Sequence, residues 1–210
     1  MLKACGRKVG IVCAVLSSLV LVIGEAQAKR RGLPVSTIAS VGPDAASPMG
    51  WVDFCRRNAE ECDSQILTPR DIHLTAANFK TLNRVNSFVN RTIEPVSDLD
   101  HWGVLDRWDL PYDGKGDCED FALLKRKILI GQGFPRQALL LTVVKDEHGD
   151  GHAVLTVKTD RGEYLLDNMV SQIRPWDRSH YVFVKLQSQS EQNVWVQIGE
   201  PTSMPLIVSR

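Results

Sequence analysis

The stretch that decides the fold is Gly114-Lys115-Gly116-Asp117-Cys118-Glu119-Asp120-Phe121-Ala122-Leu123-Leu124. Two glycines precede Asp117, a residue type that favours the N-cap position of a helix. Apolar residues then recur at helical spacing as far as Ile128. We therefore predict a helix that begins after Asp117 and ends near the glycines of residues 131–133.

This predicted helix carries Cys118 in its first turn. The unpaired backbone N–H groups and the helix dipole at that position favour an anion, so they stabilise a thiolate. A thiol at a helix start, after a glycine-rich loop, is the usual presentation of a cysteine nucleophile. The alternative is a buried structural cysteine, because cysteine also behaves as a small hydrophobic residue.

The N-terminus has the pattern of a secretory signal. Lys3, Arg7 and Lys8 precede an apolar run from residue 9 to residue 23, and Ala26-Gln27-Ala28 fits a cleavage site. We predict that residues 1–28 are a signal peptide and that the protein is exported to the periplasm. A retained N-terminal anchor is the alternative interpretation.

The charge of the chain is balanced, with 25 basic and 25 acidic residues. The predicted signal contains three basic residues and one acidic residue, so the mature chain would have 22 basic and 24 acidic residues. This balance indicates neither a nucleic-acid partner nor an acidic membrane surface. We expect residues 29–49 to be an extended or disordered lead-in, and residues 50–210 to form one domain.

Three cysteines remain after the predicted cleavage: Cys55, Cys62 and Cys118. Cys55 and Cys62 are seven residues apart with a polar stretch between them, which in an exported protein indicates a local disulfide. Cys118 is then a free thiol.

The hydrophobic periodicity changes from helical to strand-like along the chain. We predict a short helix within residues 51–62, a longer helix over residues 79–93 and the helix that follows Asp117. Strands are predicted at residues 138–144, 152–159, 163–166, 181–186 and 194–198. Helices followed by an antiparallel meander predict an α+β fold with the nucleophile helix packed on the sheet.

The segment from Ser97 to Asp113 is irregular and rich in Asp and Trp. One interpretation is a packed loop that leads into the central helix. The other is one wall of a substrate groove, because clustered aromatic residues beside a nucleophile often line a site.

His152 and Asp167 are the candidate partners of Cys118. His152 begins the second predicted strand and Asp167 ends the third, and a short turn joins these strands. In an antiparallel pair the start of one strand lies beside the end of the next, so His152 and Asp167 should be adjacent. If the helix N-terminus packs at that edge, the three residues form a Cys-His-Asp triad.

The three motifs that contain Cys118, His152 and Asp167 carry a family resemblance. These are the run of residues 116–122, His152-Ala153-Val154-Leu155 and Leu166-Asp167-Asn168. They resemble the bacterial transglutaminase-like cysteine proteinases, as does Trp108-Asp109-Leu110-Pro111 ahead of the nucleophile. The resemblance covers about residues 108–168.

The resemblance implies a papain-like, transglutaminase-like fold with Cys118, His152 and Asp167 as its triad. The family includes LapG-type periplasmic proteases, which clip surface adhesins to release biofilm cells. A cell-surface adhesin as substrate, and a membrane receptor that sequesters the enzyme, are therefore partners that the resemblance implies.

Asp117, Glu119 and Asp120 form an acidic cluster around the thiol. They are either first-turn acids that face solvent or ligands of a hard cation such as Ca²⁺. LapG-type relatives bind calcium through acids that flank the nucleophile, and Asp117 and Glu119 match those positions. Calcium is therefore the cofactor hypothesis.

The leading functional prediction is an exported cysteine peptidase that works through an acyl-enzyme. Transglutaminase-type acyl transfer to an amine is the second hypothesis, since the same fold allows both. The third is a non-catalytic, calcium-dependent binding or regulatory module, and the presence of all three triad residues argues against it.

Overall fold

The computed structural model describes residues 32–198. The predicted signal peptide, residues 1–28, lies outside the described residues, as do residues 29–31 and 199–210. Among the helices of the described part, none combines the length and the apolar character needed to cross a membrane.

The predicted order of helices followed by strands is confirmed, with several short elements added. Along the chain the elements are β1 (Asp44–Ala45), α1 (Met49–Arg57), the 3₁₀ turn η1 (Ala59–Glu61), α2 (Ala76–Thr92), β2 (Glu94–Pro95), α3 (Asp98–Trp102), β3 (Lys115–Gly116), α4 (Cys118–Gly131), η2 (Arg136–Ala138), β4 (Leu139–Lys145), β5 (Gly151–Thr159), β6 (Gly162–Leu166), β7 (Arg174–Pro175), η3 (Trp176–Arg178), β8 (Val182–Gln187) and β9 (Trp195–Gln197).

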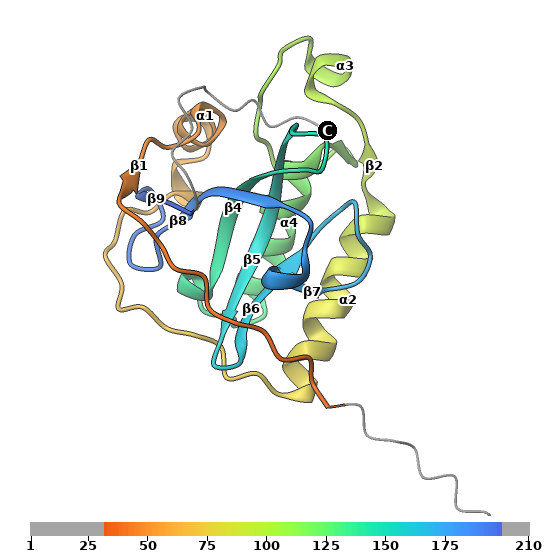
Figure 1. Cartoon of the computed structure of the whole chain (residues 1–210). Helices are drawn as coiled ribbons and strands as arrows, with labels where there is room; N and C mark the ends of the chain where they lie inside the picture. Colours follow the sequence, from red (N-terminus) through yellow and green to blue (C-terminus); the bar gives the residue numbers. More distant parts are fainter. Residues whose placement is uncertain (1–31, 199–210) are drawn as a thin grey trace, which may run out of the picture. The chain divides into compact units, whose positions relative to one another are not determined.

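A seven-stranded sheet forms the centre of the described domain, in the order β1-β9-β8-β4-β5-β6-β7 (Figure 1). All its pairs are antiparallel. The predicted meander corresponds to β4, β5 and β6, while β8 returns to pair with β4 on its other side. The fold is therefore α+β, as predicted.

Helices cover one face of the sheet. α4 lies along β5 and β4, and α2 packs on α4 (Figure 1). Three tryptophans, Trp51 of α1, Trp108 and Trp195 of β9, meet edge to face with ring centroids 6.2 to 6.5 Å apart. All three are almost completely buried, so they join α1, the segment before α4 and the sheet into one core.

The lead-in was expected to be extended or disordered, and its described part is extended and lies along the sheet. Ser36 N–H donates to the carbonyl of Arg161, and β1 pairs with β9. Ala39 packs with Leu140 and Leu186 on the face opposite α4. Backbone hydrogen bonds of this kind depend little on side-chain pattern, so the periodicity of the sequence could not indicate them.

The predicted disulfide is present between Cys55 in α1 and Cys62, just after η1. Its Cα atoms are 5.5 Å apart, within the usual range for a disulfide. Asn193, in the loop before β9, donates from its side chain to the carbonyl of Cys62. The disulfide therefore closes a loop that also contacts the loop before β9.

Candidate active site

α4 begins at Cys118, with Asp117 at the N-cap position, as predicted. The Asp117 side chain, however, makes no capping hydrogen bond within α4. Its Oδ2 instead accepts from the backbone N–H of Asp98, at 3.2 Å. The loop before the helix is held by β3, which pairs in parallel with β2 through Glu94↔Lys115.

Cys118 is the free cysteine of the described chain and is 1% exposed. Its thiol donates to Glu119 Oε2 at 3.2 Å, and its sulfur accepts from the backbone N–H of Ala153 at 3.4 Å. The second contact places the helix N-terminus against the first residues of β5. The thiol therefore lies at the N-terminal end of β5, where His152 is located.

His152 and Asp167 lie at the same end of the β5–β6 pair, because the register aligns Leu155 with Leu166. His152 Nε2 and Asp167 Oδ1 are 3.0 Å apart, and both side chains are buried. Nε2 is therefore engaged by the carboxylate, which leaves Nδ1 as the ring nitrogen available to the thiol. Cys118, His152 and Asp167, the three candidate residues from the sequence, therefore lie close together.

The electrostatics of this group favour an imidazolium. Burial lowers the pKa of His152, but the hydrogen bond to Asp167 and the neighbouring Cys118 side chain raise it, to a net value of about 10. Burial raises the pKa of Asp167, yet the interaction with His152 brings it below the usual value. A charged histidine held by an ionised aspartate can stabilise a thiolate beside it.

Tyr181 is a site residue that the sequence did not reveal. Its hydroxyl donates to Asp167 Oδ2 at 2.5 Å, and its ring lies 5.4 Å from the His152 ring. Tyr181 and Asp167 also line a cavity of about 230 Å³. We predicted a strand that begins at Tyr181. Its hydrophobic periodicity, however, does not indicate which other strand it pairs with.

Asp117 and Glu119 lie with Asp98 in a buried acidic group, the acid triplet, whose ligand atoms are all within 4.8 Å of one another. Asp117 Oδ1 and Glu119 Oε1 are buried and have no hydrogen-bond partner among the described residues. Burial raises the pKa of Asp117 to about 6 and raises that of Glu119 well above its usual value. Such a group either keeps protons or binds a cation.

Asp120, which the sequence also nominated as a ligand, lies outside the acid triplet. Its Oδ1 accepts from the backbone N–H of Asp109 at 2.6 Å. Burial raises its pKa to about 9. Asp98 takes its place in the group, and the sequence missed Asp98 because nineteen residues separate it from Asp117.

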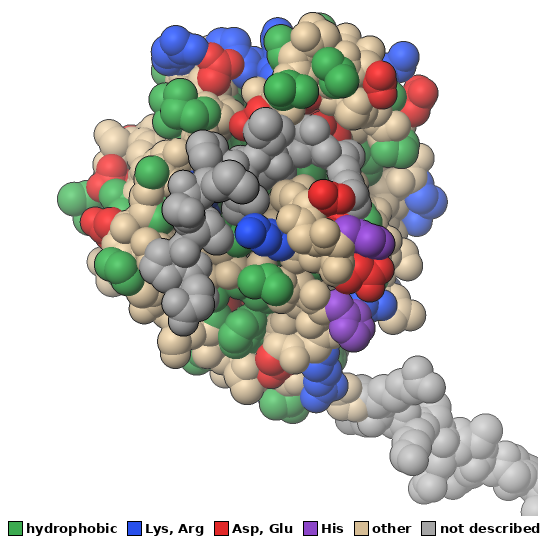
Figure 2. Space-filling view, turned by 45° about the horizontal axis from the view of Figure 1, so that its top comes forward, with side chains coloured by type: hydrophobic (Ala, Val, Ile, Leu, Met, Phe, Trp, Pro, Cys, Tyr) green, Lys and Arg blue, Asp and Glu red, His purple; other side chains and the backbone are tan. Residues whose placement is uncertain are grey.

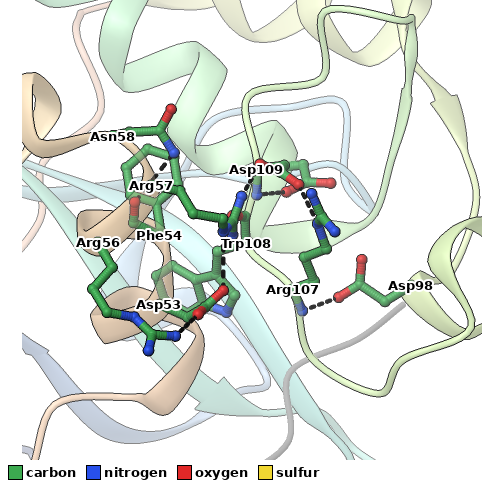
Figure 3. Close-up of polar contacts among 10 residues, drawn as sticks. Asp53, Phe54, Arg56, Arg57, Asn58, Asp98, Arg107, Trp108 and Asp109 are labelled. Atoms are coloured by element: carbon green, nitrogen blue, oxygen red, sulfur yellow. Dashed lines mark hydrogen bonds and ion pairs between the residues drawn. The ribbon is translucent and has the colours of Figure 1, made fainter.

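Asp98 is positioned by a hydrogen-bonded segment before α4 (Figure 3). The backbone N–H of Arg107 donates to Asp98 Oδ2, and Arg57 of α1 donates to the carbonyl of Trp108 at 2.8 Å. Arg57 also pairs with Asp109. The segment that holds Asp98 in place is therefore fixed to α1.

The structure supports the packed-loop interpretation for part of the Ser97–Asp113 segment, and the substrate-groove interpretation stays a prediction. Trp108 is fully buried in the core, as a packed loop requires. Trp102 is 42% exposed and lines a second cavity, of about 240 Å³, together with Asp120 of α4. On the face shown in Figure 2, acidic and basic side chains are interspersed.

Residues 41–203 match the family described as bacterial transglutaminase-like cysteine proteinase. The chain belongs to this family. Its activity class is therefore that of a cysteine peptidase, which acts on protein substrates, and the transglutaminase-like fold expected from the sequence is confirmed.

Solved structures of LapG from Legionella pneumophila are also similar to this member of the family. The calcium-bound form is 26% identical, with 62% of this chain and 76% of that chain covered and a TM-score of 0.49. A second LapG structure is 27% identical, with 56% and 68% covered and a TM-score of 0.48. The EGTA-treated form is 26% identical, with 60% and 70% covered and a TM-score of 0.46. No curated protein matches the chain.

Proposed function

We propose that this proteinase cleaves its protein substrate through an acyl-enzyme formed on Cys118. The observation that carries the proposal is that Cys118, His152 and Asp167 converge at one end of the β5–β6 pair. His152 Nε2 is hydrogen-bonded to Asp167 there. Three separate elements deliver these side chains: the start of α4, the start of β5 and the end of β6.

In this mechanism Cys118 Sγ attacks the carbonyl carbon of the scissile peptide bond. His152 holds the thiolate as an ion pair and then protonates the leaving amine, while Asp167 keeps the imidazole oriented and balances its charge. The backbone N–H of Cys118, at the helix start, is the proposed donor to the developing oxyanion. Water attacks the thioester next, with His152 as general base, and releases the acid.

The acid triplet is the proposed calcium site. Its carboxylates are hard oxygen ligands, and the unpartnered Asp117 Oδ1 and Glu119 Oε1 leave lone pairs available. Ca²⁺ takes six to eight oxygens, so water or backbone carbonyls would supply the others. A cation there would also compensate the charge of Glu119, the carboxylate that accepts the Cys118 thiol.

We place the enzyme in the periplasm, with a cell-surface adhesin as its substrate and a membrane receptor as its regulator. The basic and apolar N-terminal pattern with Ala26-Gln27-Ala28 and the Cys55–Cys62 disulfide support export. The adhesin and the receptor rest on the family resemblance alone. Incubation with candidate surface proteins, followed by mass spectrometry of the fragments, tests the substrate and separates hydrolysis from amine transfer.

The first experiment measures alkylation of Cys118 by iodoacetamide in the mature protein, across pH, with calcium and with chelator. Rapid labelling that persists well below the pH at which a free thiol ionises, about 8.5, indicates an activated nucleophile. His152→Ala should lose this labelling, whereas His148→Ala, an exposed histidine four residues away, should keep it. Labelling that follows an ordinary thiol titration would contradict the mechanism.

The variant Cys118→Ala should abolish cleavage of any substrate so found and leave the fold intact. Thermal unfolding checks the fold. If this variant cleaves like the wild type, Cys118 is not the nucleophile.

Calorimetric titration of the chelated protein tests the calcium site. Asp98→Asn, Asp117→Asn and Glu119→Gln should each weaken binding, while Asp120→Asn, outside the acid triplet, should bind calcium like the wild type. Absence of heat in the wild type would exclude the site, and weakened binding in Asp120→Asn would restore Asp120 to the ligand set.

A further inference from the structure

Among the described residues, Tyr181 is the one whose side chain donates a hydrogen bond to Asp167 Oδ2. Its hydroxyl donates to Oδ2 at 2.5 Å, whereas Oδ1 receives His152 Nε2 and the backbone N–H of Met169, each at 3.0 Å. The Tyr181 ring is tilted by 51° over the His152 ring. One phenol thus touches two members of the proposed triad.

We propose that Tyr181 is a positioning residue of the active site, which fixes the Asp167 carboxylate so that Oδ1 faces His152. This inference rests on the proposed function, because it assigns Tyr181 a role in the same triad. Nothing in the mechanism above requires Tyr181 to touch the substrate.

The hydrogen-bond pattern supports this role. A carboxylate can rotate about its bond to Cβ, and donors on both oxygens hold its plane in one orientation. Asp167 is only 3% exposed, so without Tyr181 its Oδ2 would lose a donor where water has little access. Burial and the Asp167 contact raise the pKa of Tyr181, so the phenol keeps the proton that it donates.

The backbone gives Tyr181 a rigid base. It immediately precedes Val182, the first residue of β8, which pairs with Lys145 of β4. The adjacent β4 residue, Val144, pairs with His152 of β5. The same three paired strands therefore position the phenol and the imidazole, independently of α4. A side chain on such a rigid backbone is well suited to keep the Asp167 carboxylate in one orientation.

A purely structural role is the competing explanation. Tyr181 packs against the buried group Val144, Val154 and Leu165, on the face of the sheet opposite α4. Tyr181→Phe keeps this ring packing and removes only the hydroxyl. The variant therefore separates the hydrogen bond from the packing.

The experiment compares the rate of Cys118 alkylation by iodoacetamide at pH 7 in the wild type and in Tyr181→Phe. Loss of a hydrogen bond to a charged group should slow alkylation by about tenfold. Proton NMR provides a second measurement, because the His152 Nε2–H bonded to Asp167 should give a downfield, slowly exchanging resonance. That resonance should broaden or disappear in Tyr181→Phe.

Tyr164→Phe is the matched control. Its hydroxyl also bonds within the protein, to the carbonyl of Pro34, but it lies outside the triad, so alkylation and the His152 resonance should not change. In an Asp167→Asn background, Tyr181→Phe should slow alkylation no further, because Tyr181 acts through Asp167.

The outcomes are distinct. If Tyr181→Phe is alkylated at the wild-type rate with an unchanged His152 resonance, the inference is wrong. A further slowing in the Asp167→Asn background would also overturn it. If the wild type itself shows no rapid alkylation, the proposed function fails, and the His152 resonance alone then decides whether Tyr181 holds Asp167.

Discussion

Lys125 carries a buried amine with no hydrogen-bond partner among the described residues. It lies on α4, two turns after Cys118, with its Nζ 5.8 Å from the centre of the Phe121 ring. Burial lowers the pKa of Lys125 to about 7, although the charge of Asp167 acts in the opposite direction. The fold therefore disfavours the charged form of this lysine.

Lys125→Met should stabilise the protein at pH 7. The folded-state pKa is below the unfolded value, so folding releases a proton, and stability is lost as pH falls from about 10.5 toward 7. Removing the amine should recover about 2 to 4 kcal/mol of the free energy of unfolding at pH 7 and much less at pH 10. Urea denaturation at the two pH values measures this, and an equal effect at both would contradict it.

Gly116 approaches α4 so closely that a side chain has no room. A Cβ at this position would lie 2.5 Å from Asp120 Oδ2 and 2.7 Å from its Cβ. Gly116→Ala should therefore lower the free energy of unfolding by about 1 to 3 kcal/mol and slow Cys118 alkylation. Gly131→Ala, where a Cβ meets nothing within 4 Å, is the control and should not destabilise the protein.

The sequence was sufficient to identify the site residues whose positions depend on local structure. Cys118 follows from the helix start, and His152 and Asp167 follow from one hairpin. Asp98 and Tyr181 depend on contacts between distant segments, through Arg107 and through the pairing of β8 with β4. No spacing in the sequence encodes those contacts, so they could not be predicted.

α2 begins with a true side-chain cap, unlike α4. The hydroxyl of Thr75 accepts from the backbone N–H of Asn78 at 3.1 Å. Thr75→Ala should lower the free energy of unfolding by about 1 kcal/mol, whereas Thr75→Ser, which keeps the oxygen, should change it little. Chemical denaturation of both variants measures the difference, and equal losses would show that the hydroxyl contributes nothing.

Elements with a clear period were predicted to within a few residues. α2 was expected at residues 79–93 and extends from Ala76 to Thr92. Four strands have only two residues each: β1, β2, β3 and β7. They are too short to show a hydrophobic periodicity, and their formation depends on the partner strand. The same reason explains why the pairing of the extended lead-in with the sheet was not predicted.

The disulfide ties α1 to η1 and stabilises the molecule as a whole. Replacing both cysteines, as in Cys55→Ser with Cys62→Ser, should lower the free energy of unfolding by about 2 to 3 kcal/mol, by release of loop-closure entropy in the unfolded chain. Cys118 alkylation in the folded variant should remain rapid. Urea denaturation and alkylation kinetics together test this, and loss of rapid alkylation would show that the loop supports the active site.

The family assignment of the whole molecule agrees with the sequence, because the resemblance lay in the nucleophile region and that region organises the domain. Substrate choice could not be predicted in the same way. The cavity beside Trp102 illustrates why: residues from 101 to 120, on α3, on the following loop and on α4, build it together, and no motif encodes such a surface.

In the described part of the chain, the free thiol of Cys118 coexists with the Cys55–Cys62 disulfide, and this has a practical consequence for redox chemistry. A reducing agent that keeps Cys118 from oxidising also attacks Cys55–Cys62, and the half-buried Cys55 is more accessible than the buried Cys118. Reduction of the disulfide leaves Cys55 and Cys62 as thiols, and when an oxidant returns either of them can form a disulfide with Cys118 in place of the native one. The reductant that preserves the nucleophile therefore weakens the fold that presents it, and an activity assay needs a window of mild reduction between the two effects.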